Sequence, residues 1–205
     1  MLWTSFNMDK PVWGRWGVHF DTQWRRDNVG FHWQQYQLRP GINYRISDNV
    51  LLTIGYVFTR TYPYGDYPVA RAIPEHRPYE QLLVRHRVRG MRVSHRFRLE
   101  QRFIRYPTEA DAGITYQNRF RYLARAEFPV GKSGEWYVPV FNETLIGFRP
   151  NYGARPWDQN RLFVGIGRLT ERFAVDIGYM KQLLGQRNGR IYEVNHTIMV
   201  STTLR

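Results

Sequence analysis

Residues 91–128 contain two long segments in which apolar and polar residues alternate at almost every position. A period of two is typical of β-strands, because successive side chains of a strand point to opposite faces. The apolar positions are Met91, Val93, Phe97, Leu99 and Phe103 in the first segment, and Ile114, Tyr116, Phe120, Tyr122 and Phe128 in the second. The intervening positions are mostly arginine, so each strand needs an apolar environment on one side only. A membrane β-barrel, with lipid outside and a polar lumen inside, provides that combination.

Similar alternation recurs along the 205-residue chain, near residues 16–25, 35–46, 52–59, 79–89, 136–146, 161–167, 173–182 and 192–204. The pattern predicts an all-β protein, an antiparallel up-and-down transmembrane β-barrel of 10–12 strands with a polar, arginine-rich lumen. The length suits a single domain over residues 1–205. Residues 1–9 either add a strand or form a periplasmic extension, since bacterial barrels have an even number of strands.

The expected connections alternate between short and long. Short turns are predicted at 47–49, 89–90, 130–134 and 169–171, and longer loops at 62–75, 107–113, 149–157 and 185–190. Bacterial barrels have short periplasmic turns and long extracellular loops, so we expect the C-terminus in the periplasm. Glu80 interrupts the alternation and is predicted to mark a bulge. The loops 62–75 and 149–157 are rich in aromatic residues and arginine, which favours partner binding as an alternative role for them.

The composition excludes several kinds of site and partner. Cysteine is absent, which excludes disulfides and thiolate metal sites. No apolar run reaches the roughly 18 residues of a transmembrane helix. The net charge of +13 rests on 30 basic residues, of which only Lys10, Lys132 and Lys181 are lysines. Because the arginines alternate with apolar residues along strands instead of forming a basic tail or helix, we do not expect nucleic acid as a partner.

The predicted lumen is the main candidate site. Its charged positions are Asp21, Arg39, Arg45, Arg96, Arg98, Glu100, Arg102, Arg119, Arg121, Arg125, Glu127, Glu143, Arg161 and Asp176. One interpretation is a salt-bridged plug, because buried charges are tolerated when they are paired. A second is a narrow anion-conducting passage, favoured by the excess of arginine over acid. A third is a bound phosphate, sulfate or carboxylate held by arginine forks.

Enzymatic alternatives rest on weaker patterns. His86, His95 and His196 fall in the outward phase, whereas Ser94 and Ser201 fall in the inward phase. That mismatch argues against a lipid hydrolase, because a nucleophile and its base must lie within hydrogen-bond reach. A protease or metal site could instead be built from Asp66, Glu75 and His76. No phosphate-binding, dinucleotide or zinc motif is present. We therefore predict no catalytic residues, no cofactor and no metal.

Several segments carry a resemblance to a known family. They are Glu75-His76-Arg77 with Glu80-Gln81, Arg98-Leu99-Glu100-Gln101-Arg102, Asn118-Arg119-Phe120-Arg121-Tyr122, Arg39-Pro40-Gly41 with Tyr44, and Gly55-Tyr56. Together they resemble an uncharacterised family of Gram-negative outer-membrane proteins, catalogued as a domain of unknown function. The resemblance implies an outer-membrane location, with lipid or lipopolysaccharide around the wall and a signal peptide removed on export. It implies no activity. The leading interpretation is a structural barrel or a narrow anion-binding or anion-conducting pore, and the alternative is an accessory subunit that docks to another envelope protein.

Overall fold

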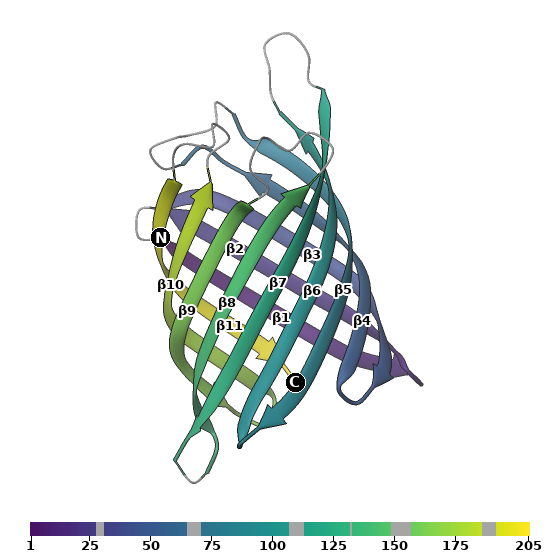
Figure 1. The fold of residues 1–205 in the computed structure, drawn as a ribbon. Helices are drawn as coiled ribbons and strands as arrows, with labels where there is room; N and C mark the ends of the chain where they lie inside the picture. The colour runs from purple at the N-terminus through teal and green to yellow at the C-terminus, as the bar shows by residue number, and fades with distance from the viewer. Residues whose placement is uncertain (28–30, 65–70, 107–112, 132, 149–156, 186–191) are drawn as a thin grey trace.

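The computed structural model describes residues 1–27, 31–64, 71–106, 113–131, 133–148, 157–185 and 192–205. Across these residues the chain forms eleven strands that close into one barrel (Figure 1). The strands are β1 (Leu2–Trp13), β2 (Trp16–Asp27), β3 (His32–Ser47), β4 (Val50–Thr61), β5 (Ile73–Val88), β6 (Met91–Arg105), β7 (Ile114–Val130), β8 (Trp136–Phe148), β9 (Trp157–Leu169), β10 (Phe173–Gly185) and β11 (Tyr192–Leu204). None of the described segments is a helix long and apolar enough to cross a membrane.

The barrel closes through a parallel pair. Strands β1 and β11 run side by side in the same direction, with Leu2 opposite Ile198 and Met8 opposite Leu204. In an up-and-down barrel with an odd number of strands, the first and last strands point the same way, so the closing pair must be parallel. The expectations of purely antiparallel pairing and of an even strand count were therefore wrong. Residues 2–9 lie within β1 and do not form a periplasmic extension.

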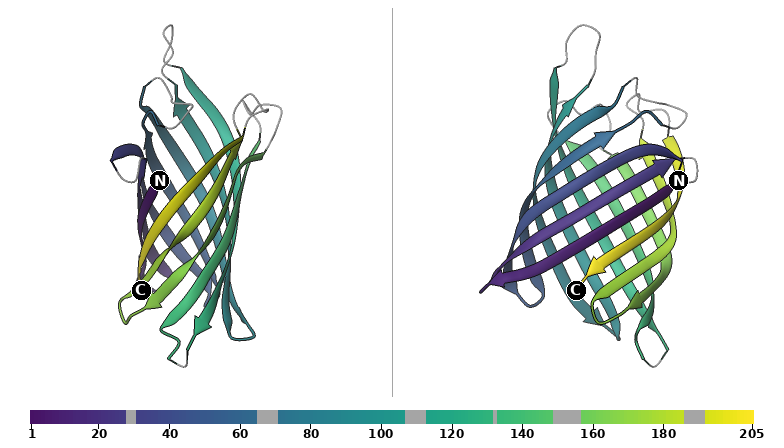
Figure 2. Two further views of the ribbon diagram at one scale, coloured as in Figure 1. Left: turned by 90° about the vertical axis from the view of Figure 1, so that its left-hand side faces the viewer. Right: turned by 180° about the vertical axis from the view of Figure 1, so that it is seen from behind.

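The two ends of the barrel differ. At one end, here called the turn end, short turns join β1 to β2, β3 to β4, β5 to β6, β7 to β8 and β9 to β10. The C-terminus lies at the turn end, as both views in Figure 2 show. The opposite end, where the other connections lie, is called the loop end. In the turn between β5 and β6, Arg89 and Gly90 both have positive φ, of 49° and 85°, which suits the tight hairpins whose twist matches that of paired strands.

Strand β5 is longer than the sequence pattern indicated. It begins at Ile73, so Glu75 belongs to the strand and not to a loop. Glu80 pairs with Ile54 and with Leu99 in unbroken register, so the bulge predicted at Glu80 does not occur. The pairing register shifts at other places. Gln34 on β3 is an extra residue in the pairing with β2, and Asp158 on β9 is an extra residue in the pairing with β8.

The wall has two faces of opposite character. Large apolar side chains are exposed on the outside, for example Ile54 at 62%, Ile166 at 61% and Ile198 at 52%. The inward positions of the same strands carry polar and charged groups that are mostly buried. The alternation seen in the sequence is therefore present in strands all around the barrel, and it places the charged residues in the lumen.

Two lumen tyrosines lie against glycines of the wall. A Cβ atom added to Gly55 would lie 2.5 Å from the ring of Tyr79, and one added to Gly167 would lie 2.2 Å from the ring of Tyr137. Glycine in a strand allows such close approach. The ring of Tyr79 in turn supports Arg98, whose guanidinium carbon lies 4.4 Å from the ring centroid.

Candidate functional site in the barrel lumen

The structure brings most of the predicted lumen residues together. Thirteen of the fourteen take part in ion pairs inside the barrel. The exception is Arg45, which is exposed at the turn end and lines a hollow of about 440 Å³ there.

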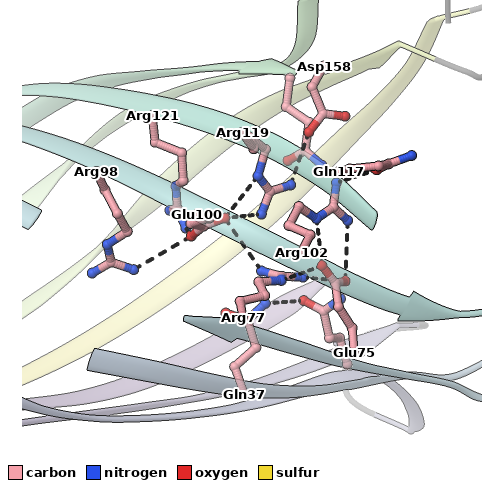
Figure 3. Close-up of polar contacts among 12 residues, drawn as sticks. Gln37, Glu75, Arg77, Arg98, Glu100, Arg102, Gln117, Arg119, Arg121 and Asp158 are labelled. Carbon is pink, nitrogen blue, oxygen red and sulfur yellow. Dashed lines mark hydrogen bonds and ion pairs between the residues drawn. The ribbon is translucent and has the colours of Figure 1, made fainter. Parts of the chain in front are cut away.

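Glu100 on β6 is the centre of the ion pairs. Its side chain is fully buried, with 0% exposure, although it carries a charge. One carboxylate oxygen accepts bonds from Arg119 at 2.9 and 2.6 Å, and the other accepts a bond from Arg121 at 2.7 Å. Arg77 and Arg98 each approach to 3.9 Å from other sides (Figure 3). Four arginines therefore surround one carboxylate, which stabilises a buried charge that would be costly alone.

Towards the loop end, the cluster continues to a second carboxylate, Glu75. Arg77 donates two bonds to it at 2.5 and 2.7 Å, and Arg102 donates two more at 2.5 and 3.2 Å (Figure 3). Asp158 accepts a bond from Arg119 at 3.0 Å. Because Asp158 is the extra residue at a register shift, its side chain reaches the lumen although its position in the alternation would not predict this.

On the other side of Glu100, Arg121 links to a third carboxylate, Glu143 on β8. Arg121 donates to Glu143 at 3.0 and 2.6 Å, while Arg96 and Arg161 donate at 2.8 and 2.9 Å. Arg121 therefore bridges Glu100 and Glu143 and joins the two groups into one network. Both Arg121 donors meet the same oxygen of Glu143, and charge-assisted hydrogen bonds of this kind are stronger than neutral ones.

Nearer the turn end, the paired side chains are more exposed. Arg125 donates to Glu127 at 2.8 Å and to Asp176 at 2.9 Å. Tyr137 donates its hydroxyl to Asp176 at 2.7 Å, and Arg92 donates to Glu127 at 2.7 Å. A separate buried pair, Arg39 with Asp21 at 2.9 Å, lies on the β2–β3 side of the lumen.

Positive charge exceeds negative charge in this network. Among the described residues ten arginines and seven carboxylates form the ion pairs. Arg25 is an eleventh lumen arginine, and it is buried with Gln35 and Gln23 as hydrogen-bond partners and the ring of Trp3 at 3.8 Å. We call these eighteen residues the arginine network: Asp21, Arg25, Arg39, Glu75, Arg77, Arg92, Arg96, Arg98, Glu100, Arg102, Arg119, Arg121, Arg125, Glu127, Glu143, Asp158, Arg161 and Asp176.

An apolar cluster also lies in the lumen, in contact with two arginines of the network. Trp3, Phe141, Phe163 and Met180 form a buried cluster, against which Leu123 and other partly buried residues pack. The rings of Phe141 and Phe163 stack with centroids 4.9 Å apart. Lumen-facing positions of membrane barrels are usually polar, so this cluster is a departure from the expected pattern.

A cavity of about 900 Å³ lies between the network and the turn end. Arg98, Arg121 and Glu143 line its inner part, and Asn49 and Leu169 line it beside the turns. The residues of the Glu75 group do not line it. The lumen therefore contains a charged and closely packed part towards the loop end and a hollow part reaching the turn end.

Among the described residues, neither Ser94 nor Ser201 is hydrogen-bonded to one of the histidines considered for catalysis. His95 and His196 are bonded to tyrosines of the wall, Tyr122 at 2.9 Å and Tyr179 at 2.5 Å. Ser201 instead receives a bond from Ser5 at 2.9 Å, and Ser94 lines the lumen cavity.

Of the residues considered for a metal site, Glu75 and His76 lie on opposite faces of β5. Glu75 is buried in the network, His76 is exposed on the outer face, and Asp66 lies outside the described residues. Across the described ranges, no group of three or more histidine, aspartate or glutamate residues could hold a metal ion. Residues 65–70 and 149–156, within the two connections considered for partner binding, also lie outside the described residues.

Sequence reasoning missed five members of the network. Glu75 and Arg77 share the inward phase of β5, but the prolines near them concealed the strand. Arg92 and Arg25 fell in recognised strands without being singled out. Asp158 gave no signal, because its inward placement depends on a register shift that only the pairing of β8 and β9 reveals.

Comparison with known proteins gives one positive finding. Residues 1–193 match the family described as "Protein of unknown function (DUF2490)". The chain belongs to this family. No curated protein and no solved structure matches the chain. The family match supports the predicted relation to an uncharacterised family, and it carries no information on activity or on cellular location.

Proposed function

We propose that this DUF2490 protein is a non-enzymatic barrel of the bacterial outer membrane, closed by its arginine network, that holds an anion in the cavity beneath. The membrane location is supported by the outer wall, where apolar side chains such as Ile42, Ile54 and Ile166 are about 60% exposed. Rows of this kind around a whole barrel are unfavourable in water and favourable against lipid. The partner of the wall would then be lipid or lipopolysaccharide.

The burial of the arginine network is the observation that carries the proposal. In an open channel, water reaches the charged side chains of the lumen. Here Arg39 and Arg98 are 1% exposed and Glu100 is 0% exposed. The apolar cluster of Trp3 and Phe163, which lies beside the network, is equally buried. Eleven strands also lie between the roughly eight of a barrel filled by side chains and the roughly sixteen of a porin. A closed barrel fits these observations better than an anion-conducting pore.

The cavity and the charge excess support anion binding. Arginine forks recognise phosphate, sulfate and carboxylate groups through paired hydrogen bonds. The cavity opens beside the turns, so that in the usual orientation of bacterial barrels it would face the periplasm.

The location is tested by expressing the chain with an export signal in a Gram-negative host and separating the inner and outer membranes. We expect the protein in the outer-membrane fraction, folded and resistant to extraction with sodium carbonate. Recovery as a folded, monodisperse protein from the soluble fraction without detergent would contradict the membrane assignment. Anion binding is tested separately, by titrating the reconstituted barrel with inorganic phosphate and with carboxylates.

A further inference from the structure

Among the described network arginines that line the lumen cavity, Arg98 alone makes no hydrogen bond to a carboxylate. Its Nε and Nη2 atoms both donate to Gln81, at 3.0 and 2.6 Å. Its Nη1 atom is buried and makes no hydrogen bond, and the nearest carboxylate, Glu100, lies 3.9 Å away. Glu100 already accepts closer bonds from Arg119 and Arg121. The charge of Arg98 is therefore paired only at 3.9 Å, and its buried Nη1 donor has no hydrogen-bond partner among the described residues.

This unsatisfied donor borders the lumen cavity. Arg98 lines the cavity at its inner part and is itself 1% exposed (Figure 3 shows it at the edge of the network). Asp21 also lines the cavity, but its charge is paired with Arg39 at 2.9 Å. The neighbouring arginines Arg96 and Arg121 are both bonded to Glu143. An anionic group at this point would meet an arginine whose nearest carboxylate is 3.9 Å away, beside two arginines that already donate to a carboxylate at 2.8 and 2.6 Å.

The remainder of the cavity lining explains why a simple ion would not fill it. Its other side presents Leu123, Phe141, Met180 and Met199, from β7, β8, β10 and β11. Strands β10 and β11 are across the barrel from β5, which carries Gln81, whereas β7 is next to β6, which carries Arg98. Methionine and phenylalanine form adaptable apolar surfaces. A volume of about 900 Å³ is within the range of pockets that bind small organic molecules.

We propose that the cavity binds an amphipathic anion, with its acidic group on Arg98 and its hydrocarbon part against the Leu123–Phe141–Met180–Met199 surface. This inference rests on the proposed function and specifies its ligand class. A carboxylate attached to an aliphatic chain can contact both Arg98 and the apolar surface. Acetate or phosphate can bind only to Arg98, and an aliphatic alcohol can pack only against the apolar surface.

The test uses the full chain reconstituted in lipid vesicles and four probes: octanoate, acetate, inorganic phosphate and octanol. Binding is measured by isothermal titration calorimetry, and vesicles without protein provide the blank for partitioning. We expect octanoate to bind at least about tenfold more tightly than acetate or phosphate, because its methylene groups leave water on binding. Arg98→Gln should remove the preference for octanoate over octanol, and Arg98→Lys should retain part of it.

The control variant is Arg60→Gln, an exposed arginine near the loop end of β4, which should bind like the unmodified chain. Circular dichroism of each variant checks that the barrel is folded. Equal affinity for octanoate, acetate and phosphate would overturn the proposal that the ligand is amphipathic, and it would leave the proposal of anion binding intact. No binding of any of the three anions would overturn both proposals. Retention of octanoate selectivity in folded Arg98→Gln would overturn the assignment of Arg98.

Discussion

Removing the charge of Glu100 tests the network at its centre. Glu100→Gln keeps the size of the side chain but leaves Arg119 and Arg121 without the carboxylate that they share. Three bonds of 2.6–2.9 Å are affected, and a hydrogen bond to a charged group contributes about 1.5–3 kcal/mol. The glutamine carbonyl can still accept some of these bonds, so their simple sum is an upper bound. Breaking a buried ion pair at one partner costs about 3–5 kcal/mol, and we expect a loss of that size in the free energy of unfolding.

The assay is urea unfolding of the refolded barrel in detergent micelles, followed by tryptophan fluorescence. Glu80→Gln is the matched control, because Glu80 is exposed on the outer face and accepts a bond from Gln101 at 3.1 Å. We expect the control to change stability by less than about 0.5 kcal/mol. The double variant Glu100→Gln with Arg119→Gln should cost less than the sum of the single variants, because the two side chains interact directly. Equal stability of Glu100→Gln and the unmodified chain, or strict additivity in the double variant, would refute the argument.

Three further substitutions test the packing of the lumen by the same unfolding assay. Gly55→Ala should cost about 1–3 kcal/mol, since its Cβ would lie 2.5 Å from Tyr79, whereas Gly113→Ala, with no atom within 4 Å, should change little. Trp3→Ala should cost about 3–5 kcal/mol, because it empties the centre of the apolar cluster and leaves two stacked arginines without support. Tyr137→Phe should cost about 1.5–3 kcal/mol through loss of one hydrogen bond to an aspartate of β10. A Tyr137→Phe cost above that of Trp3→Ala would show that the hydroxyl, and not the packing, is decisive.

The sequence predicted which side chains of a strand share a face, because alternation depends only on local strand geometry. Arg119 and Arg121 could be assigned to the lumen together with Glu100 in this way. The sequence did not reveal which arginine meets which acid, since that depends on register. Glu100 is directly opposite Arg119, but Arg96 reaches Glu143 across an intervening strand.

Features that depend on closure of the barrel could not be predicted from the local alternation of residues in the sequence. The parallel pairing of β1 with β11 follows from an odd strand count, and the weak alternation of residues 2–8 left that count open. The apolar cluster forms because inward positions of four separate strands converge, including Phe163 and Met180. Each of these residues alone looks like a local exception in a polar row, and only the closed barrel brings them together.

Single-channel recording tests the central claim that the arginine network closes the lumen. The refolded barrel is inserted in a planar bilayer in asymmetric KCl, and insertion is verified by protease protection in vesicles from the same preparation. The buried state of Glu100, Arg39 and Arg98 predicts an inserted barrel without reproducible conductance steps. Stable, anion-selective steps from the unmodified protein would contradict the account and would establish an open arginine-lined path instead.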